Sequence, residues 1–157
     1  MTRKSSSCSV FIPVFLTAFL FLPTPSLAAK EKIFAQALAE QTLAKHPEIS
    51  GIELAVRSST GCLTVAASDP KDIGEKCDKD ELEPMRTGKP SVEKEKDGFD
   101  VTLAIHDRTG EVIGTVGMDF KAKPGQQRSS VIEAAEKIRQ ELEAEIPSLP
   151  RLLEPVD

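Results

Sequence analysis

The spacing of apolar and polar residues changes along the chain from a helical period to strand alternation and back to a helical period. Residues 30–45 are rich in Ala, Leu, Glu and Gln, and the apolar residues Ile33, Phe34 and Leu38 recur at helical spacing. Pro47 cannot continue a helix, so the pattern ends there. The spacing predicts a long N-terminal helix.

Alternation of apolar and polar residues predicts two β-hairpins. It runs over residues 52–57 and 62–67, and again over 99–106 and 112–120, and a short turn containing Gly joins the two members of each pair. Residues 90–95 carry Glu and Lys, which an exposed edge strand tolerates. We therefore expect an α+β fold, with an antiparallel sheet of about five strands, a long N-terminal helix and a C-terminal helix.

The segment over residues 68–89 follows neither pattern. It contains Asp-Pro and a run of charges around a short predicted helix, with Gly74 and Gly88 as candidate hinges, which is typical of a loop that closes over a site. Cys77 lies in this segment, and Cys62 precedes it. No Cys-x-x-Cys or Cys-x-x-Cys-His is present, so a structural disulfide fits the pair better than a redox or metal site.

The last apolar periodicity predicts a C-terminal helix that begins at Ser130. The sequence from Ser130 to Glu133 has the form of a capping box, in which a hydroxyl and a carboxylate satisfy free backbone N–H groups. Pro147 stops the helix, and residues 147–157 are expected to form a flexible, Pro-containing tail with little to bury. The apolar stripe of the helix consists of Ile132, Ala135, Ile138, Leu142 and Ile146.

The first 28 residues have the pattern of a secretory signal peptide. Arg3 and Lys4 precede an apolar run over residues 10–22, and Ser26-Leu-Ala28 matches a signal-peptidase site. The run is shorter than a membrane-spanning helix needs, although an uncleaved N-terminal anchor is the alternative. Cleavage after Ala28 would leave 129 of the 157 residues, enough for one domain. We expect an exported protein, either periplasmic or extracellular.

The composition of the processed chain excludes several kinds of partner. Once Arg3 and Lys4 are removed, 18 basic residues face 25 acidic ones, which gives a net charge of −7. Such a surface repels phosphate backbones and anionic lipid, so neither nucleic-acid nor membrane binding is expected after signal cleavage. The chain has no Trp and no Tyr, which excludes base-stacking platforms and aromatic cages for quaternary amines. No motif for a cofactor is present, and no metal site is expected.

Three short phrases, at residues 68–74, 87–90 and 107–120, are similar to those of a known domain family. They resemble the single-Cache type of the Cache domain family, the extracytoplasmic PAS-like sensor modules of bacteria, within a similarity that covers roughly residues 30–146. The last phrase contains Gly-Thr-Val-Gly-Met-Asp119. In Cache domains such a final strand runs down the centre of the sheet and can place its Asp at the ligand pocket. The resemblance implies a bacterial sensor module with a PAS-like fold.

Cache domains usually belong to membrane receptors with an output domain, whereas this chain ends soon after its last predicted helix. The resemblance therefore implies a stand-alone accessory module that binds a small polar or carboxylate ligand and acts with a membrane-bound signalling or transport protein. A secreted protein–protein interaction or structural domain without a small-molecule ligand is the alternative. Catalysis is not expected, because Gly-x-Ser-x-Gly, His-Glu-x-x-His and phosphate-loop motifs are absent.

One face of the predicted sheet carries polar side chains that fit a small-ligand cleft or, equally, an ordinary solvated surface. Arg57 would clamp a carboxylate and Asp119 would accept from an amine or hydroxyl, and an ion pair between these two is the alternative. His106 is also explained as an exposed residue beside the turn. In the ligand-binding interpretation, residues 69–90 close over the face. The candidate ligand contacts are Arg57, Thr102, His106, Thr115 and Asp119.

Overall fold

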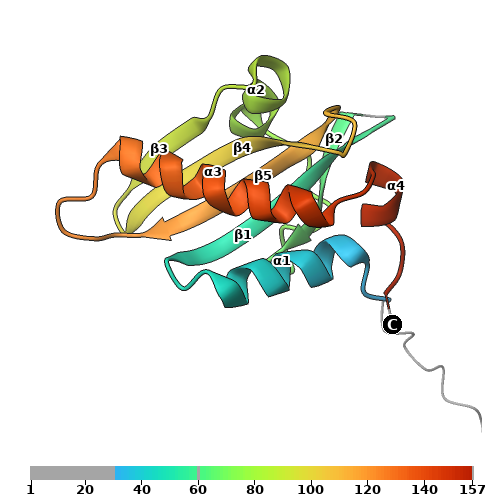
Figure 1. Cartoon of the computed structure of the whole chain (residues 1–157), viewed down its shortest axis with the longest axis horizontal. Coiled ribbons are helices and arrows are strands. Elements are labelled where there is room, and N and C mark those ends of the chain that lie inside the picture. Colours follow the sequence, from blue (N-terminus) through green and yellow to red (C-terminus); the bar gives the residue numbers. More distant parts are fainter. Residues whose placement is uncertain (1–30, 60, 157) are drawn as a thin grey trace, which may run out of the picture.

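Five antiparallel strands form one sheet in the computed structural model, which describes residues 31–59 and 61–156. The strand order is β2-β1-β5-β4-β3, so β5 runs down the centre (Figure 1). The predicted signal peptide over residues 1–28 lies outside the described residues. The elements are α1 (Phe34–Lys45), β1 (Ile49–Ser58), β2 (Gly61–Ala67), α2 (Lys79–Thr87), β3 (Ser91–Glu95), β4 (Gly98–His106), β5 (Val112–Lys121), α3 (Arg128–Glu145) and α4 (Leu149–Leu152).

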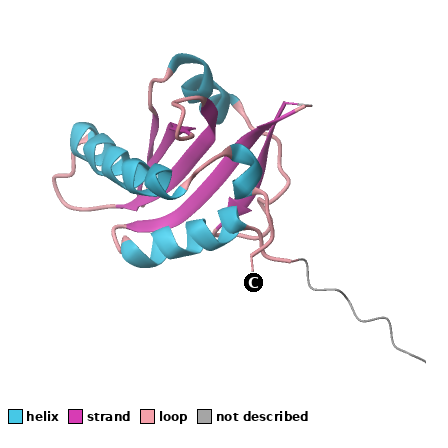
Figure 2. Cartoon of the chain, turned by 45° about the vertical axis from the view of Figure 1, so that its right-hand side comes forward, coloured by secondary structure: helices cyan, strands magenta, loops and turns pink. Residues whose placement is uncertain are grey.

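Helices α1 and α3 lie across one face of the sheet and enclose the hydrophobic core (Figures 1 and 2). Strand alternation turns every second side chain towards these helices, and Leu54, Val101 and Val116 are fully buried there. Leu38 of α1 and Ile138 of α3 pack against them. The predicted α+β class with a five-stranded antiparallel sheet is confirmed.

The N-terminal helix is shorter than predicted. Helix α1 begins at Phe34 and has 12 residues, whereas Ile33 before it is extended and pairs with Pro155. Backbone hydrogen bonds on both sides of this bridge join residues 32–34 to residues 154–156, and we call this pairing the terminal clasp. The predicted first turn of the helix is thus replaced by contact with the other end of the chain, which local spacing does not reveal.

Residues 147–156 are part of the fold and not the expected flexible tail. They contain helix α4, and the side chain of Leu152 is fully buried in the core. Pro150 lies in the first turn of this helix, where its missing N–H costs nothing. The proline therefore starts a helix here instead of ending ordered structure.

Helix α3 begins earlier than predicted and without the predicted capping box. Its first residue is Arg128, its N-cap residue Gln127 makes no side-chain capping bond, and the Ser130 hydroxyl donates to the Gln127 carbonyl at 2.7 Å. Val131 takes the buried position predicted for Ile132, because spacings of four, three and four residues keep one side of the helix on the sheet. The buried residues of the helix are Val131, Ala135, Ile138 and Leu142.

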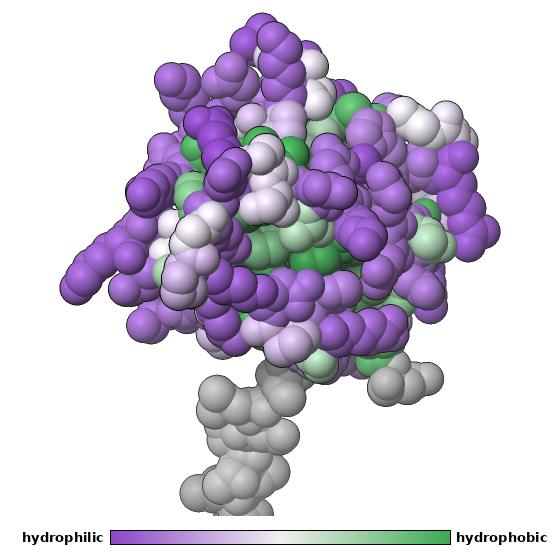
Figure 3. Space-filling model, turned by 60° about the vertical axis from the view of Figure 1, so that its left-hand side comes forward, coloured by the Kyte–Doolittle hydropathy of each residue, from purple (hydrophilic) through white to green (hydrophobic). Residues whose placement is uncertain are grey.

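The outer surface is mostly polar. Figure 3 shows one side of the molecule, on which hydrophilic residues cover most of the area and apolar residues are seen mainly in a hollow framed by them. In the described part of the chain, the large apolar side chains that are exposed are Leu82 and Leu153, by 47% and 43%. None of the described helices combines the length and the apolar character that crossing a bilayer requires.

Candidate functional site

The face of the sheet opposite α1 and α3 divides into two halves. Over one half, α2 packs on β4 and β5, and its Met85 contacts Ala55 and Cys62. Thr115 lies in register between Ala55 and Ala104 in this covered half and is buried. The other half is the floor of a cavity of about 590 Å³, a size typical of small-molecule sites.

Two cross-strand rows of residues form the floor of this cavity. The first row consists of Glu93, Asp100, Asp119 and Gly51, on β3, β4, β5 and β1. The second row consists of Thr102, Gly117 and Glu53, on β4, β5 and β1. A Cβ on Gly51 would overlap the carboxylate of Asp119, so the glycine makes room for that group. A Cβ on Gly117 would make only ordinary van der Waals contacts, so the centre of the floor is open.

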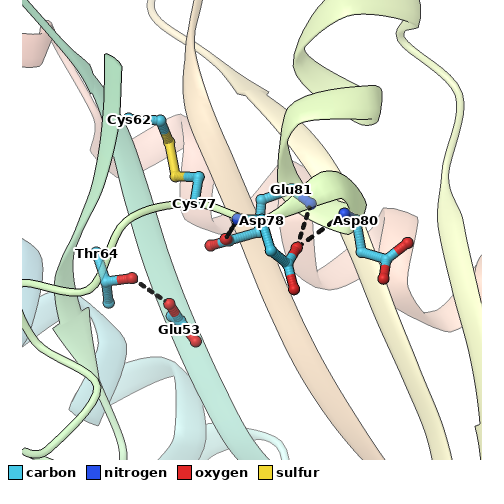
Figure 4. Close-up of a disulfide and its surroundings, with 7 residues drawn as sticks. All are labelled: Glu53, Cys62, Thr64, Cys77, Asp78, Asp80 and Glu81. Atoms are coloured by element: carbon cyan, nitrogen blue, oxygen red, sulfur yellow. Dashed lines mark hydrogen bonds between the residues drawn. A yellow bond between two sulfur atoms is a disulfide. The ribbon is translucent and has the colours of Figure 1, made fainter. Parts of the chain in front are cut away.

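Residues 68–78 and the first turn of α2 form the wall of the cavity. The disulfide between Cys62 and Cys77, whose Cα atoms are 5.3 Å apart, ties this segment to β2 (Figure 4). The backbone N–H of Gly74 also donates to the carbonyl of Thr64 on β2 at 2.9 Å. The disulfide and the hydrogen bond therefore attach the wall to β2, an edge strand of the sheet.

The two glycines of the wall region form turns. Gly74 and Gly88 have φ angles of 98° and 69°, in the left-handed region that favours glycine. Gly88 is the C-cap of α2 and donates its N–H to the carbonyl of Pro84 at 2.8 Å. Because both glycines are held by backbone hydrogen bonds, the structure does not support hinges at these positions.

The cavity is lined mainly by acidic residues. Lys76 is the one basic residue and Ile52 the one large apolar residue among the lining residues in the described chain. A surface of this sign attracts cations and repels anions. The lining carboxylates number ten and belong to Glu53, Asp69, Asp72, Glu75, Asp78, Asp80, Glu81, Glu93, Asp100 and Asp119.

Two carboxyls of the first row, those of Asp100 and Asp119, have raised pKa values. Burial raises the pKa of Asp100 to about 7, with smaller contributions from the charge of Asp119 and from those of Glu95, Glu93 and Asp80. Burial also raises the pKa of Asp119. Asp100 therefore exchanges its proton near neutral pH, whereas an exposed aspartate would be fully ionised there.

Glu53 in the second row and Glu81 in the wall also have raised pKa values. Burial raises the pKa of Glu53, although the hydroxyl of Thr64 donates a hydrogen bond to its carboxylate (Figure 4). Burial raises the pKa of Glu81 to about 6, and the nearby Glu53 adds to this effect. The N–H of Asp78 opposes it by donating to the Glu81 carboxylate at 2.8 Å. This bond is half of a capping box between Asp78 and Glu81, which starts α2 and places both acids at the cavity.

Thr102 offers a free hydroxyl to the cavity. The residue is only 4% exposed and lines the floor. Among the described residues, no group forms a hydrogen bond with its hydroxyl. Because this hydroxyl has no partner within the described chain and its oxygen is open to the cavity, it is available to a ligand.

Two of the five predicted ligand contacts lie at the cavity. Asp119 and Thr102 line its floor, whereas Thr115 is buried in the half that α2 covers. Arg57 is exposed near the far end of β1. Asp119 pairs with Gly51, six residues before Arg57, which is about 20 Å along a strand. Arg57 and Asp119 therefore form no ion pair in the described chain, and Arg57 lies outside the cavity.

His106 contacts α3 and not the cavity. Its backbone N–H and its Nδ1 each lie 2.8 Å from Oε1 of Glu143. Arg139 donates to the same oxygen at 2.6 Å. The histidine therefore lies outside the cavity, is not a free residue beside the turn, and joins the end of β4 to α3.

Sequence reasoning placed Glu53 on the polar face without naming it as a ligand contact, and it did not identify Asp100 and Glu81 as cavity residues. Asp100 and Glu53 alternate with core residues in their strands, and Glu81 follows Asp78 at the spacing of a capping box. The sequence around each of these residues thus contained a pattern that indicates where its side chain lies. The acidic excess of the polar face and of residues 69–81 would have indicated a negatively charged site.

Comparison with known proteins identifies the fold. No family model matches the sequence. No curated protein matches it either. The GAF domain of a two-component sensor histidine kinase from Bacillus halodurans has a TM-score of 0.53 at 9% identity, over 70% of this chain and 91% of that chain. The second GAF domain of DevS from Mycobacterium smegmatis has a TM-score of 0.52 at 13% identity, over 71% of this chain and 89% of that chain.

A third structure, the repressor BlcR from Agobacterium tumefaciens, has a TM-score of 0.50 at 11% identity, over 70% of this chain and 66% of that chain. At such identities the likeness shows the fold alone. Assignment to the Cache family stays a prediction. The PAS-like fold is confirmed, in the form that GAF domains have.

Proposed function

We propose that this protein is a sensor-like ligand-binding module and that the acidic cavity is its ligand site. The observation that carries the proposal is the cavity itself, with polar side chains on its floor and a wall that a disulfide holds in place. One structure of similar fold is the GAF domain of a sensor histidine kinase, which supports a sensory role.

The alternative function, a protein-interaction domain without a small ligand, would favour a flat or filled sheet face and apolar patches on the terminal helices. The face is hollow instead, and α3 exposes no large apolar side chain among the described residues. The two large apolar side chains that are exposed, Leu82 and Leu153, belong to α2 and to the end of α4. These observations favour a small ligand.

The ligand of this cavity is polar and is not an anion. Arg57, which was predicted to clamp a carboxylate, lies outside the cavity, and Lys76 is the one basic residue among the lining residues of the described chain. Ten carboxylates face the cavity and would repel a further one. We therefore replace the predicted carboxylate ligand with a neutral or cationic one.

The module acts outside the cytoplasm in this proposal. The signal-peptide pattern and the pairing of Cys62 with Cys77 both support export to an oxidising compartment. There it would serve as an accessory to a membrane-bound signalling or transport protein, as the Cache resemblance implies. Intact-mass measurement of the exported protein should show cleavage after Ala28, and retention of Met1 would contradict this.

A thermal-shift screen with Gly117→Val as a matched variant tests the site. Valine suits a strand, and it would fill the open floor without backbone strain because Gly117 does not have a positive φ. A specific ligand at a hundredfold excess over its Kd should add about 2.7 kcal/mol to the unfolding free energy of the wild type, and much less to that of Gly117→Val. If amines, amides, carboxylates and nucleobases all leave the wild type unchanged, or stabilise both proteins equally, the proposed site is wrong.

A further inference from the structure

We propose that the ligand is a linear diamine or polyamine whose N–H-bearing cationic nitrogens bind the two rows of the cavity floor, one at Asp100 and Asp119 and the next at Glu53 and Thr102. The inference rests on the proposed function, because it names the ligand class of the same cavity.

The first argument is the row formed by Glu93, Asp100 and Asp119. These carboxylates lie on three adjacent strands and face one another directly in the sheet register. Like charges in such cross-strand positions destabilise a sheet. In the described part of the chain, the Lys and Arg ion pairs involve other carboxylates and none of these three. A cationic ligand would turn this repulsion into attraction.

The second argument is independent of charge and comes from Thr102. Its hydroxyl is directed to the floor of the cavity beside Gly117, and no described residue forms a hydrogen bond with it. The described residues leave no buried side-chain oxygen without a partner, so the Thr102 oxygen is open to the cavity, where it can accept hydrogen bonds. A ligand nitrogen that donates an N–H at this point would satisfy the hydroxyl and contact the neighbouring Glu53 at the same time.

The distribution of the acids indicates an extended cation. Within residues 31–59 and 61–156, no three His, Cys, Asp or Glu side chains are close enough together to hold a metal ion. The two rows of the floor are separated by two residues along each strand, which is roughly 6.6 Å. Two ammonium groups joined by a few methylene groups can reach both rows, whereas a single ion cannot.

The lining side chains indicate the type of nitrogen. Quaternary ammonium groups are recognised by aromatic rings, and no aromatic residue lines this cavity. Primary and secondary ammonium groups carry N–H donors, which carboxylate and hydroxyl oxygens accept. Ile52 is the one large apolar residue at the cavity, so the ligand has little apolar bulk beyond its methylene chain.

Calorimetry with putrescine and spermidine on the oxidised protein, at about 0.15 M salt, tests the inference. We expect saturable binding of one ligand per protein. Asp100→Asn and Asp119→Asn should each weaken the affinity about tenfold or more, and Gly117→Val should abolish measurable binding. The matched control is Glu133→Gln, on the exposed side of α3, which removes the same charge away from the cavity and should change the affinity less than about twofold.

Three results would overturn the inference while leaving the proposed site in place. One is a non-amine ligand from the screen that Gly117→Val blocks, with no binding of either amine. Another is Ca²⁺ or Mg²⁺ binding that displaces spermidine and depends on Asp100 and Asp119 with higher affinity than the amine. The third is a blocked trilysine peptide that binds more tightly than spermidine, because the cavity would then recognise lysine side chains of a partner protein.

Two further results would overturn the inference, and the second of them would overturn the proposed site as well. If Glu133→Gln weakens spermidine binding as much as Asp100→Asn does, the amine is held by the general negative charge of the surface. If Gly117→Val changes the affinity of no ligand that binds, the cavity is not where ligands bind.

Discussion

The carboxylate of Asp100 lies between those of Glu93 and Asp119 in the register of three adjacent strands. The side chain is partly withdrawn from water, and this burial is the main reason for its raised pKa. Without a cation in the cavity, the ionised side chain of Asp100 therefore lowers the stability of the fold. Its position is explained by the ligand that the cavity is proposed to bind and not by stability.

At the residue scale we predict that Asp100→Asn stabilises the unliganded protein at pH 8. The amide keeps the shape of the side chain and removes two like-charge contacts across the sheet, so the unfolding free energy should rise by about 0.5–1 kcal/mol. Urea unfolding at pH 8 measures this change through the transition midpoint. Glu133→Gln is the control and should stay within about 0.5 kcal/mol of the wild type. A loss of stability in Asp100→Asn would contradict the repulsion argument.

At the element scale, the β4–β5 hairpin shows what the sequence could and could not predict about the site. Alternation predicts the strands and most of their polar faces, because side chains alternate along a regular strand, but the irregularity at Ile105 and His106 brings His106 to α3. It does not predict the register. A two-residue loop between Asp107 and Gly110 would pair Asp100 with Gly117, whereas the longer turn and the irregularity at Ile105 and His106 pair Asp100 with Asp119.

The difference between predicting a face and predicting positions along it also explains why some of the predicted ligand contacts lie away from the cavity. Arg57 and Asp119 belong to the same face, as predicted, but they lie at different points along it. The position of α2 over one half of that face depends on contacts distant in sequence, such as that of Met85 with Ala55. Those contacts have no local signal, so the extent of the cavity could not be predicted from spacing.

The disulfide that holds the wall is expected to contribute to the unfolding free energy of the protein. Its cysteines are 15 residues apart, so replacing both Cys62 and Cys77 with Ser should lower the unfolding free energy by about 3 kcal/mol in the chain-entropy model. Chemical denaturation in the oxidised state measures this difference. A reducing agent should destabilise the wild type by a similar amount and leave the double variant unchanged. A wild type that is insensitive to reduction would show that the disulfide is not present in solution.

Helix α4 provides a matched pair for testing whether the C-terminal residues belong to the core. Leu152 is fully buried, whereas the next residue, Leu153, is 43% exposed. Leu152→Ala should lower the unfolding free energy by about 2–5 kcal/mol, because it leaves a cavity in the core. Leu153→Ala should change it by no more than about 0.5 kcal/mol. Equal small effects on thermal or urea unfolding would mean that the C-terminal residues are the flexible tail after all.

At the scale of the whole molecule, the cluster of raised carboxyl pKa values predicts an unusual dependence of stability on pH. The pKa values of Asp100, about 7, and Glu81, about 6, lie above those of the unfolded chain, and those of Glu53 and Asp119 are also raised. Between about pH 4 and 7 the folded protein therefore binds more protons than the unfolded chain. By linkage, its unfolding free energy should fall as the pH rises through this range.

Urea unfolding from pH 5 to pH 8 checks this dependence. The unliganded wild type should be more stable at pH 5.5 than at pH 8, and Asp100→Asn should show a flatter profile because it lacks the group whose pKa is raised to about 7. Spermidine should stabilise the wild type most at pH 8, where the carboxylates are ionised and its amines are still protonated. A stability that rises steadily from pH 5 to pH 8 without ligand would contradict the prediction.

The terminal clasp determines how the protein would respond to mechanical force. Residues 32–34 run antiparallel to residues 154–156, so residues 31 and 156 leave the fold at the same corner (Figure 1). Tension applied between these two points would load the hydrogen bonds of the clasp one after another and then pull on α4. The five-stranded sheet would bear the load only after these contacts had broken. The cavity is thus insulated from tension at the chain ends, and a tether attached there would restrain the domain without distorting its binding site.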